Sequence, residues 1–341
     1  MDNYDLHEAA RSGQLTKLPP GAFTLERLRA RNAAGNTPLH TIAKYGGLGL
    51  LPPALVTAAT LSLRNDAGYT PLHHAGINGH LDDVPRQFLT PELLGLTSNS
   101  GYTVFHVAAA HGHLQQLPAA LLTREVARLP THLGNTLLHE AAESGALDRL
   151  PAEFLTAANL QLRNLGGETV LHVAAFNGHL DQLPRELLTA PVLLETTNAG
   201  DTVLHAAAIS GHLGQIPAEF LTHDHLVVAS KAGFTVIHAA AETGQLAQIP
   251  RERLTTDLLL TRNDNGDTPL HAAAYEGHLD QVPPALFTAD LLGVRNYDGV
   301  AVGRVAVARG FAHQLPLAFR PKPPGALRRG LIRLGLARAK Y

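Results

Sequence analysis

Apolar and polar positions recur along the chain with a fixed period of 33 residues. Each unit reads approximately G-x-T-(P/V)-L-H-x-A-A-x-x-G-H-L-x-x-(L/I/V)-P-x-x-(L/F)-L-T-x-x-L-L. A histidine marks the register in nine units, and Arg304 stands at this place in the tenth: His7, His40, His73, His106, His139, His172, His205, His238 and His271. Because one such unit is too small to bury its own apolar face, the pattern predicts stacked repeats that share a core.

The first half of each unit predicts an α-helix with marked ends. A glycine such as Gly35 suits a turn that needs a positive φ, and Thr37 follows as a helix N-cap. Pro38 then stands at the first helical position, where its missing N–H costs nothing. Small pairs such as Ala108–Ala109 allow close helix–helix approach, and a second glycine ends the helix as its C′ residue.

The second half of each unit contains a proline that interrupts the helical pattern. Before it, an inward-facing leucine such as Leu81 predicts a second helix, and the proline, as at Pro184, begins a new turn. A threonine such as Thr189 then caps another short helix, with a buried leucine four residues later. Six units place an acid two residues after this threonine, where the helix dipole favours negative charge. We therefore expect two short helices after the first helix.

The repeat resembles the ankyrin repeat family. The matching residues are T-P-L-H at 37–40, 70–73 and 268–271, and G-H-L at 79–81, 178–180 and 277–279. The resemblance covers residues 1 to about 319 and implies an all-α, ankyrin-type solenoid with turns projecting to one side. It also implies that the repeated histidines hydrogen-bond between neighbouring turns and helices. The proline departs from the family, whose second helix usually continues and ends in a Gly-Ala pair.

The uninterrupted frame predicts one array of ten units over residues 1–319. We expect an N-terminal cap unit at about 1–34, eight interior units at about 35–298, and a C-terminal cap unit at about 299–319. The unit at the N-terminus is polar, and the tenth unit has Ala301 in place of the capping threonine. Residues 320–341 form a separate basic, proline-containing tail.

Composition gives little support for catalysis or metal binding. The chain has no Cys, which excludes a thiolate metal site and a Cys nucleophile. Fourteen of its 20 His belong to the repeat, and neither His111 with His113 nor His223 with His225 has a third ligand at a plausible spacing. Phosphate-binding, dinucleotide-binding and hydrolase motifs are absent. We expect no catalytic residues, no metal and no cofactor.

The positions that the repeat leaves variable are the candidates for function. In the ankyrin architecture they follow the turn glycine or precede the glycine that ends the first helix, and together they line one concave face. Exposed aromatic residues among adaptable polar ones are typical of a protein-binding surface. The alternative is that they are neutral solvent positions. We name the following fourteen residues the candidate binding face: Tyr45, Tyr69, Ile77, Tyr102, His111, Glu143, Glu168, Phe176, Asp201, Phe234, Glu242, Asp267, Tyr275 and Glu276.

Charge separates the array from the tail. Residues 317–341 hold seven of the 27 Lys and Arg and no acid, which leaves 20 basic residues against 29 acids in the array. The acidic array argues against nucleic-acid binding. Leu327, Leu331 and Leu334 have helical spacing, so the tail is either a solvated or capping segment or a basic amphipathic helix on an anionic membrane or nucleic acid.

These features predict a monomeric, cytoplasmic scaffold whose partner is another protein. The chain starts without a basic and apolar leader, and no apolar run is long enough to cross a bilayer. The alternative function is a membrane-associated adaptor, tethered by its tail, whose repeats present cargo.

Overall fold

The computed structural model describes residues 5–321, which are helical throughout and contain no strand. The chain falls into two compact units, residues 1–206 and 207–341, and the boundary falls within helix α13 (Val203–Ser210). Over residues 5–321, none of the helices has the length and apolar character that a bilayer crossing requires. The sequence-based prediction for the tail beyond residue 321 lies outside the described residues.

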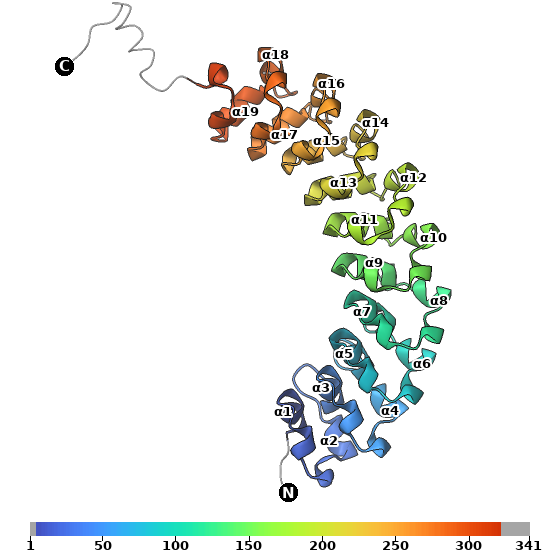
Figure 1. The fold of residues 1–341 in the computed structure, drawn as a ribbon. Helices are drawn as coiled ribbons and strands as arrows, with labels where there is room; N and C mark the ends of the chain where they lie inside the picture. The colour runs from blue at the N-terminus through green and yellow to red at the C-terminus, as the bar shows by residue number, and fades with distance from the viewer. Residues whose placement is uncertain (1–4, 322–341) are drawn as a thin grey trace, which may run out of the picture. The chain divides into compact units, whose positions relative to one another are not determined.

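The predicted first helix is present in all ten repeats (Figure 1). The first helices of neighbouring repeats pack against one another. In residues 1–206 these are α1, α3, α5, α7, α9 and α11, and in residues 207–341 they are α15, α17 and α19. Besides α13, the first helices are α1 (Leu6–Arg11), α3 (Pro38–Lys44), α5 (Pro71–Asn78), α7 (Val104–Ala110), α9 (Leu137–Ser144), α11 (Val170–Asn177), α15 (Val236–Glu242), α17 (Pro269–Glu276) and α19 (Val302–Ala308).

The ends of the first helices confirm the interpretation of the repeat. Thr70 is the N-cap of α5 and Pro71 its first residue, while Gly79 ends it in the left-handed conformation at φ 74°. Gly68, in the preceding turn, has φ 80°, and a Cβ there would lie 2.7 Å from the backbone nitrogen of Asn99. The turn glycine is therefore required by both conformation and space.

The repeated threonine and histidine form one buried unit. In α5, the Thr70 N–H donates to Nδ1 of His73 at 3.1 Å, and the Thr70 hydroxyl lies 2.8 Å from the same nitrogen. Because Nδ1 accepts the backbone N–H, the proton of the neutral ring is on Nε2, which donates to the Tyr102 carbonyl oxygen of the next repeat at 2.9 Å. The histidine thus caps its own helix and holds the neighbouring turn, as the resemblance implied.

The second half of each repeat differs from the expected pair of short helices. The segment that begins at Leu81 is only a three-residue 3₁₀ turn, and the proline starts a second 3₁₀ turn. The short helix predicted before the proline is therefore present in 3₁₀ form, because Pro85 follows too soon for an α-helix to add a full turn beyond Leu81. The first turns are η1 (Leu15–Lys17), η3 (Leu48–Leu50), η5 (Leu81–Asp83), η7 (Leu114–Gln116), η9 (Leu147–Arg149), η11 (Leu180–Gln182), η13 (Leu213–Gln215), η15 (Leu246–Gln248), η17 (Leu279–Gln281) and η19 (Ala312–Gln314). The second turns are η2 (Pro20–Ala22), η4 (Pro53–Leu55), η6 (Arg86–Phe88), η8 (Ala119–Leu121), η10 (Ala152–Phe154), η12 (Arg185–Leu187), η14 (Ala218–Phe220), η16 (Arg251–Arg253), η18 (Pro284–Leu286) and η20 (Leu317–Phe319).

The threonine-capped outer helix is present as predicted. The Thr90 hydroxyl accepts the Leu93 N–H at 3.4 Å, and Leu94 is completely buried. In the outer helix that follows Thr189, Pro191 takes the second helical position and the threonine makes no side-chain cap bond. The outer helices are α2 (Leu25–Arg29), α4 (Ala58–Leu61), α6 (Pro91–Leu94), α8 (Arg124–Ala127), α10 (Ala157–Leu160), α12 (Ala190–Leu193), α14 (His223–Leu226), α16 (Thr256–Leu259) and α18 (Ala289–Gly293).

Glutamines at the end of the first 3₁₀ turn join successive repeats. The Gln116 side chain accepts the Leu81 N–H at 3.1 Å and donates to the Gly79 carbonyl oxygen at 2.7 Å. Gln182 makes the same two bonds to Leu147 and Gly145. These glutamines bond to backbone groups at the junction of the first helix and the 3₁₀ turn, which have no helical partner there. Their role is therefore structural.

We expect Thr169→Ala to lower the free energy of unfolding by about 1 to 2 kcal/mol. The Thr169 side chain is completely buried, caps α11 and contacts Nδ1 of His172 at 2.8 Å. Thr169→Ser keeps the hydroxyl and is the matched control. Denaturant unfolding of both variants measures the effect, and an alanine variant as stable as the serine variant would contradict the capping role.

Candidate functional site

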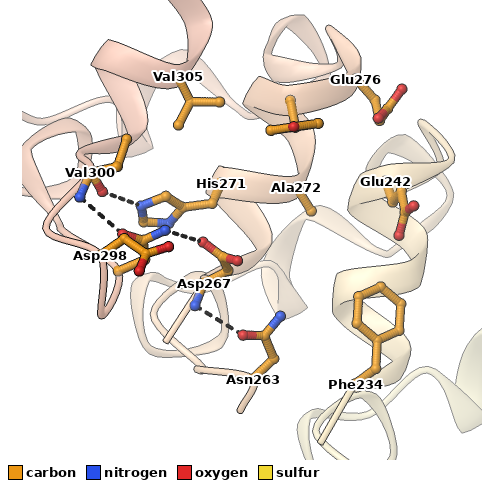
Figure 2. Close-up of a pocket in the computed structure, with 12 residues that line it drawn as sticks. Phe234, Glu242, Asn263, Asp267, His271, Ala272, Glu276, Asp298, Val300 and Val305 are labelled. Atoms are coloured by element: carbon orange, nitrogen blue, oxygen red, sulfur yellow. Dashed lines mark hydrogen bonds between the residues drawn. The ribbon is translucent and has the colours of Figure 1, made fainter. Parts of the chain in front are cut away.

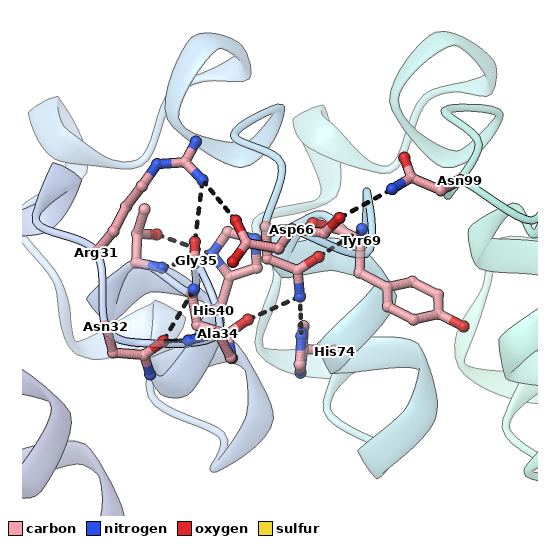
Figure 3. A network of polar contacts seen from close by, with 12 residues as sticks. Arg31, Asn32, Ala34, Gly35, His40, Asp66, Tyr69, His74 and Asn99 are labelled. Carbon is pink, nitrogen blue, oxygen red and sulfur yellow. Dashed lines mark hydrogen bonds and ion pairs between the residues drawn. The ribbon is translucent and has the colours of Figure 1, made fainter.

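The turns between repeats are rigid because side chains replace missing backbone partners. Asn65 Oδ1 accepts the Tyr69 N–H at 2.9 Å, and its amide nitrogen donates to Asn36 of the preceding turn at 2.8 Å. The same link joins Asn164 to Asn135 at 3.0 Å and Asn296 to Asp267 at 2.8 Å. Figure 3 shows a further link of this kind, in which the Asn99 amide donates to the Asp66 carbonyl oxygen at 2.8 Å. The residues after the turn glycine are thus held in fixed positions.

The fourteen residues of the candidate binding face differ in exposure. Half-buried members are Tyr69, Ile77, Tyr102, Asp201, Phe234 and Asp267, and the exposed members are Tyr45, His111, Glu143, Glu168, Phe176, Glu242, Tyr275 and Glu276. The exposed fraction reaches 53% for both Phe176 and Tyr275. Large apolar side chains at this exposure are the ones with most surface to bury on a partner.

In residues 1–206, two tyrosines of the face lie against histidines and a buried carboxylate. The Tyr69 ring lies 5.3 Å from that of His73 and 6.2 Å from that of His74. Burial and the nearby carboxylate of Glu140 raise the pKa of Tyr102 to about 12. Burial also raises the pKa of Glu140, whose side chain accepts from Asn135 at 3.0 Å. This part of the face is therefore packed against its own repeats.

In residues 207–341, five residues of the face line one pocket. Phe234, Glu242, Asp267, Tyr275 and Glu276 surround a volume of about 440 Å³, together with residues that sequence reasoning had not selected (Figure 2). They come from α15, α17 and the turns that precede them. The structure therefore joins two aromatic side chains and three acids that lie far apart in the sequence.

The remaining candidates are not gathered into this pocket. Tyr45 lies at the end of α3, where the Lys44 ammonium is 5.4 Å from its ring, and it lines a small pocket of about 110 Å³. Phe176 ends α11 without an aromatic neighbour among the described residues. His111 at the end of α7 bonds to the Val107 carbonyl oxygen at 2.9 Å.

The repeated histidines serve structure. Burial lowers the pKa of His40 and of His73 to about 4, so both rings are neutral at pH 7. Their two nitrogens are occupied by the cap and by the next turn, which leaves no lone pair for a metal or for proton transfer. Over residues 5–321, no three His, Asp or Glu side chains are grouped so that they could hold a metal ion.

Sequence reasoning missed the position directly after the repeated histidine. It holds His74 and Glu140 in residues 1–206 but the small Ala272 in the pocket. It also missed Asn263 and Asp298, which line the same pocket. Asp298 directly precedes Gly299 in the turn before α19. Comparing this position across the units would have found it, because its size and polarity change while its neighbours stay constant.

The geometry therefore defines a class of protein: a helical repeat protein that presents its turns and the ends of its first helices as a surface. The ankyrin repeat family model matches residues 265–283, which include the T-P-L-H of α17 and the following glycine. No curated protein shows significant sequence similarity to the chain. This match identifies residues 265–283 as an ankyrin repeat, and the repeated caps and the serial packing of the first helices are consistent with an ankyrin-type helical repeat fold. Ankyrin repeats are generally protein–protein interaction modules and typically non-enzymatic.

Proposed function

We propose that the chain is a non-catalytic scaffold that binds a protein partner on the candidate binding face. The observation that supports this most is the gathering of Phe234, Tyr275 and three acids around one pocket on that face. The outer helices offer no comparable set, because their large leucines, such as Leu94 and Leu226, are turned inward and completely buried.

The partner's chemistry follows from the distribution of side chains. The face carries tyrosines and Ile77 in its first repeats, and Glu168, Asp201, Glu242, Asp267 and Glu276 later in the chain. A partner should therefore present apolar side chains to the first repeats and basic side chains to the later ones. A standard interface of about 1,600 Å² would use only some of the ten repeats.

We expect Phe176→Ala to weaken partner binding by about 2 kcal/mol, or roughly thirtyfold, because exposed aromatic anchors dominate interface energies. Phe176 is a sharper choice than Tyr69 or Tyr102, whose rings pack on histidines of their own fold. The partner is first captured by pull-down and identified by mass spectrometry. Titration calorimetry then gives the dissociation constant.

The matched control removes another exposed apolar side chain, this time from an outer helix. Leu25 in α2 is 42% exposed, so Leu25→Ala should leave the dissociation constant unchanged. Gln182 is unsuitable as a control, because it joins two repeats. Weaker binding by Leu25→Ala together with normal binding by Phe176→Ala would place the interface on the outer helices.

A further inference from the structure

The pocket in residues 207–341 has an apolar floor and aromatic walls. Ala272 and Val305 line it from α17 and α19, and Phe234 lies at its edge (Figure 2). Tyr275 also belongs to the lining. Ala272 takes the position after the repeated histidine, where α5 and α9 carry the larger side chains of His74 and Glu140. The small side chain therefore leaves room at this point of the face.

The rim of the pocket is acidic. Glu242, Asp267, Glu276 and Asp298 all line it, and no Lys or Arg does. Among residues 5–321, only Glu276 of these four forms an ion pair, with Arg309. Glu242, Asp267 and Asp298 therefore line the pocket without an ion pair, although Asp267 accepts the Asn296 amide at 2.8 Å. This excess of negative charge favours a cation over a neutral or anionic ligand.

One guanidinium of the protein, that of Arg309, already contacts two residues of the pocket lining, Tyr275 and Glu276. The guanidinium carbon of Arg309 lies 4.0 Å from the centre of the Tyr275 ring, and its Nη2 lies 3.9 Å from Oε1 of Glu276. Its Nε also donates to the Tyr275 carbonyl oxygen at 3.0 Å. Aromatic stacking combined with carboxylate pairing is the way in which planar guanidinium groups are bound.

We propose that the pocket receives an arginine side chain of the partner protein. The guanidinium plane stacks on Phe234 or Tyr275 and its N–H groups donate to a carboxylate of the rim, either Glu242 or Asp298, while the aliphatic stem lies over Ala272. Lysine fits less well, because its ammonium is a compact and strongly hydrated charge that cannot stack. This inference rests on the proposed function, since it names the side chain that the later repeats recognise.

The test uses the full chain and a defined probe. N-acetyl-arginine amide is titrated into the ¹⁵N-labelled protein and followed by NMR, with N-acetyl-citrulline amide as the uncharged probe of nearly the same shape. We expect saturable shifts at the amides of Asp267, Ala272 and Glu276, with a dissociation constant on the order of 1 mM for a single side chain. The arginine probe should bind at least about fivefold more tightly than the citrulline probe.

Variants separate charge from shape. Glu242→Gln with Asp298→Asn should weaken the arginine probe about fivefold, whereas Glu252→Gln with Asp280→Asn makes the same charge change at exposed residues outside the pocket and should have no effect. Ala272→Leu fills the floor and should abolish binding of both probes. If that variant does not fold, the comparison of the two charge-removing double variants still decides the question.

Equal binding of arginine and citrulline, or equal losses in the two charge pairs, would overturn the assignment. The proposed function fails separately. If partner binding depends on Phe176 but the arginine probe does not bind in the pocket, the proposed scaffold function stands and only the arginine site is contradicted. If the probe binds but neither Phe176→Ala nor the pocket variants change the affinity for the partner, the proposed function is contradicted instead.

Discussion

Lowering the pH from 7 to 4 is expected to unfold the repeats of residues 1–206. His40 and His73 are buried, their pKa is lowered to about 4, and an unfolded chain would titrate near 6.5. Between these values the unfolded chain binds protons that the folded chain does not, so stability falls as the pH falls. The contribution is fully present above pH 6.5 and is lost by about pH 4.

The size of the effect is comparable with the whole stability of a domain. Over this range the free energy of unfolding falls by about 3 kcal/mol for each of these two histidines, because one pKa unit corresponds to about 1.4 kcal/mol. Burial also lowers the pKa of three further repeat histidines in residues 1–206: His106, His139 and His172. A domain is stable by only about 5–15 kcal/mol, so the sum is decisive.

Thermal unfolding followed by circular dichroism at pH 7, 6, 5 and 4 measures this dependence. The midpoint should change little above pH 6.5 and fall steeply below pH 6. His132→Gln, which replaces an exposed histidine in a turn, should leave the curve unchanged. A constant midpoint from pH 7 to 4.5 would show that the histidines are not held neutral by the caps.

Phe105→Ala should destabilise residues 1–206 by about 3–5 kcal/mol, since it empties a site in the centre of the core. Phe105 is 2% exposed in α7 and stands where neighbouring repeats have Leu72 and Leu138. Phe105→Leu restores the residue of those repeats and should cost about 1 kcal/mol.

The location of this loss is as informative as its size. In a repeat array each unit contacts only its neighbours, so the damage should stay local. Native-state hydrogen exchange should show lost protection in α5, α7 and α9, while α17 and α19 remain protected. Equal loss of protection along the whole chain would contradict nearest-neighbour coupling.

The parts of the fold that could be predicted are those in which one residue type has one physical use. A glycine at φ 80° or a proline at the first helical position admits few alternatives, so Gly68 and Pro71 were interpreted correctly. The segment at Leu81 could not be assigned in the same way. An inward leucine suits an α-helix and a 3₁₀ turn equally, and the choice depends on Gln116, which caps the broken end from the next repeat.

The candidate site was predictable in its positions and not in its grouping. Sequence placed Phe234, Glu242 and Tyr275 on one face, because the period fixes where each falls in its repeat. That they enclose a pocket depends on the small Ala272 between them and on Asp298 at the tip of the following turn. Both effects arise between repeats and are not visible within one unit.

The most direct test of protein binding on the candidate binding face is a hydrogen-exchange comparison of the free chain with its complex. With the captured partner bound, we expect slower exchange at the turns around residues 65–69, 98–102 and 263–267 and at the ends of α11 and α17. The outer helices α4, α6 and α16 should exchange as in the free protein. Protection confined to the outer helices, with those turns unchanged, would contradict the account.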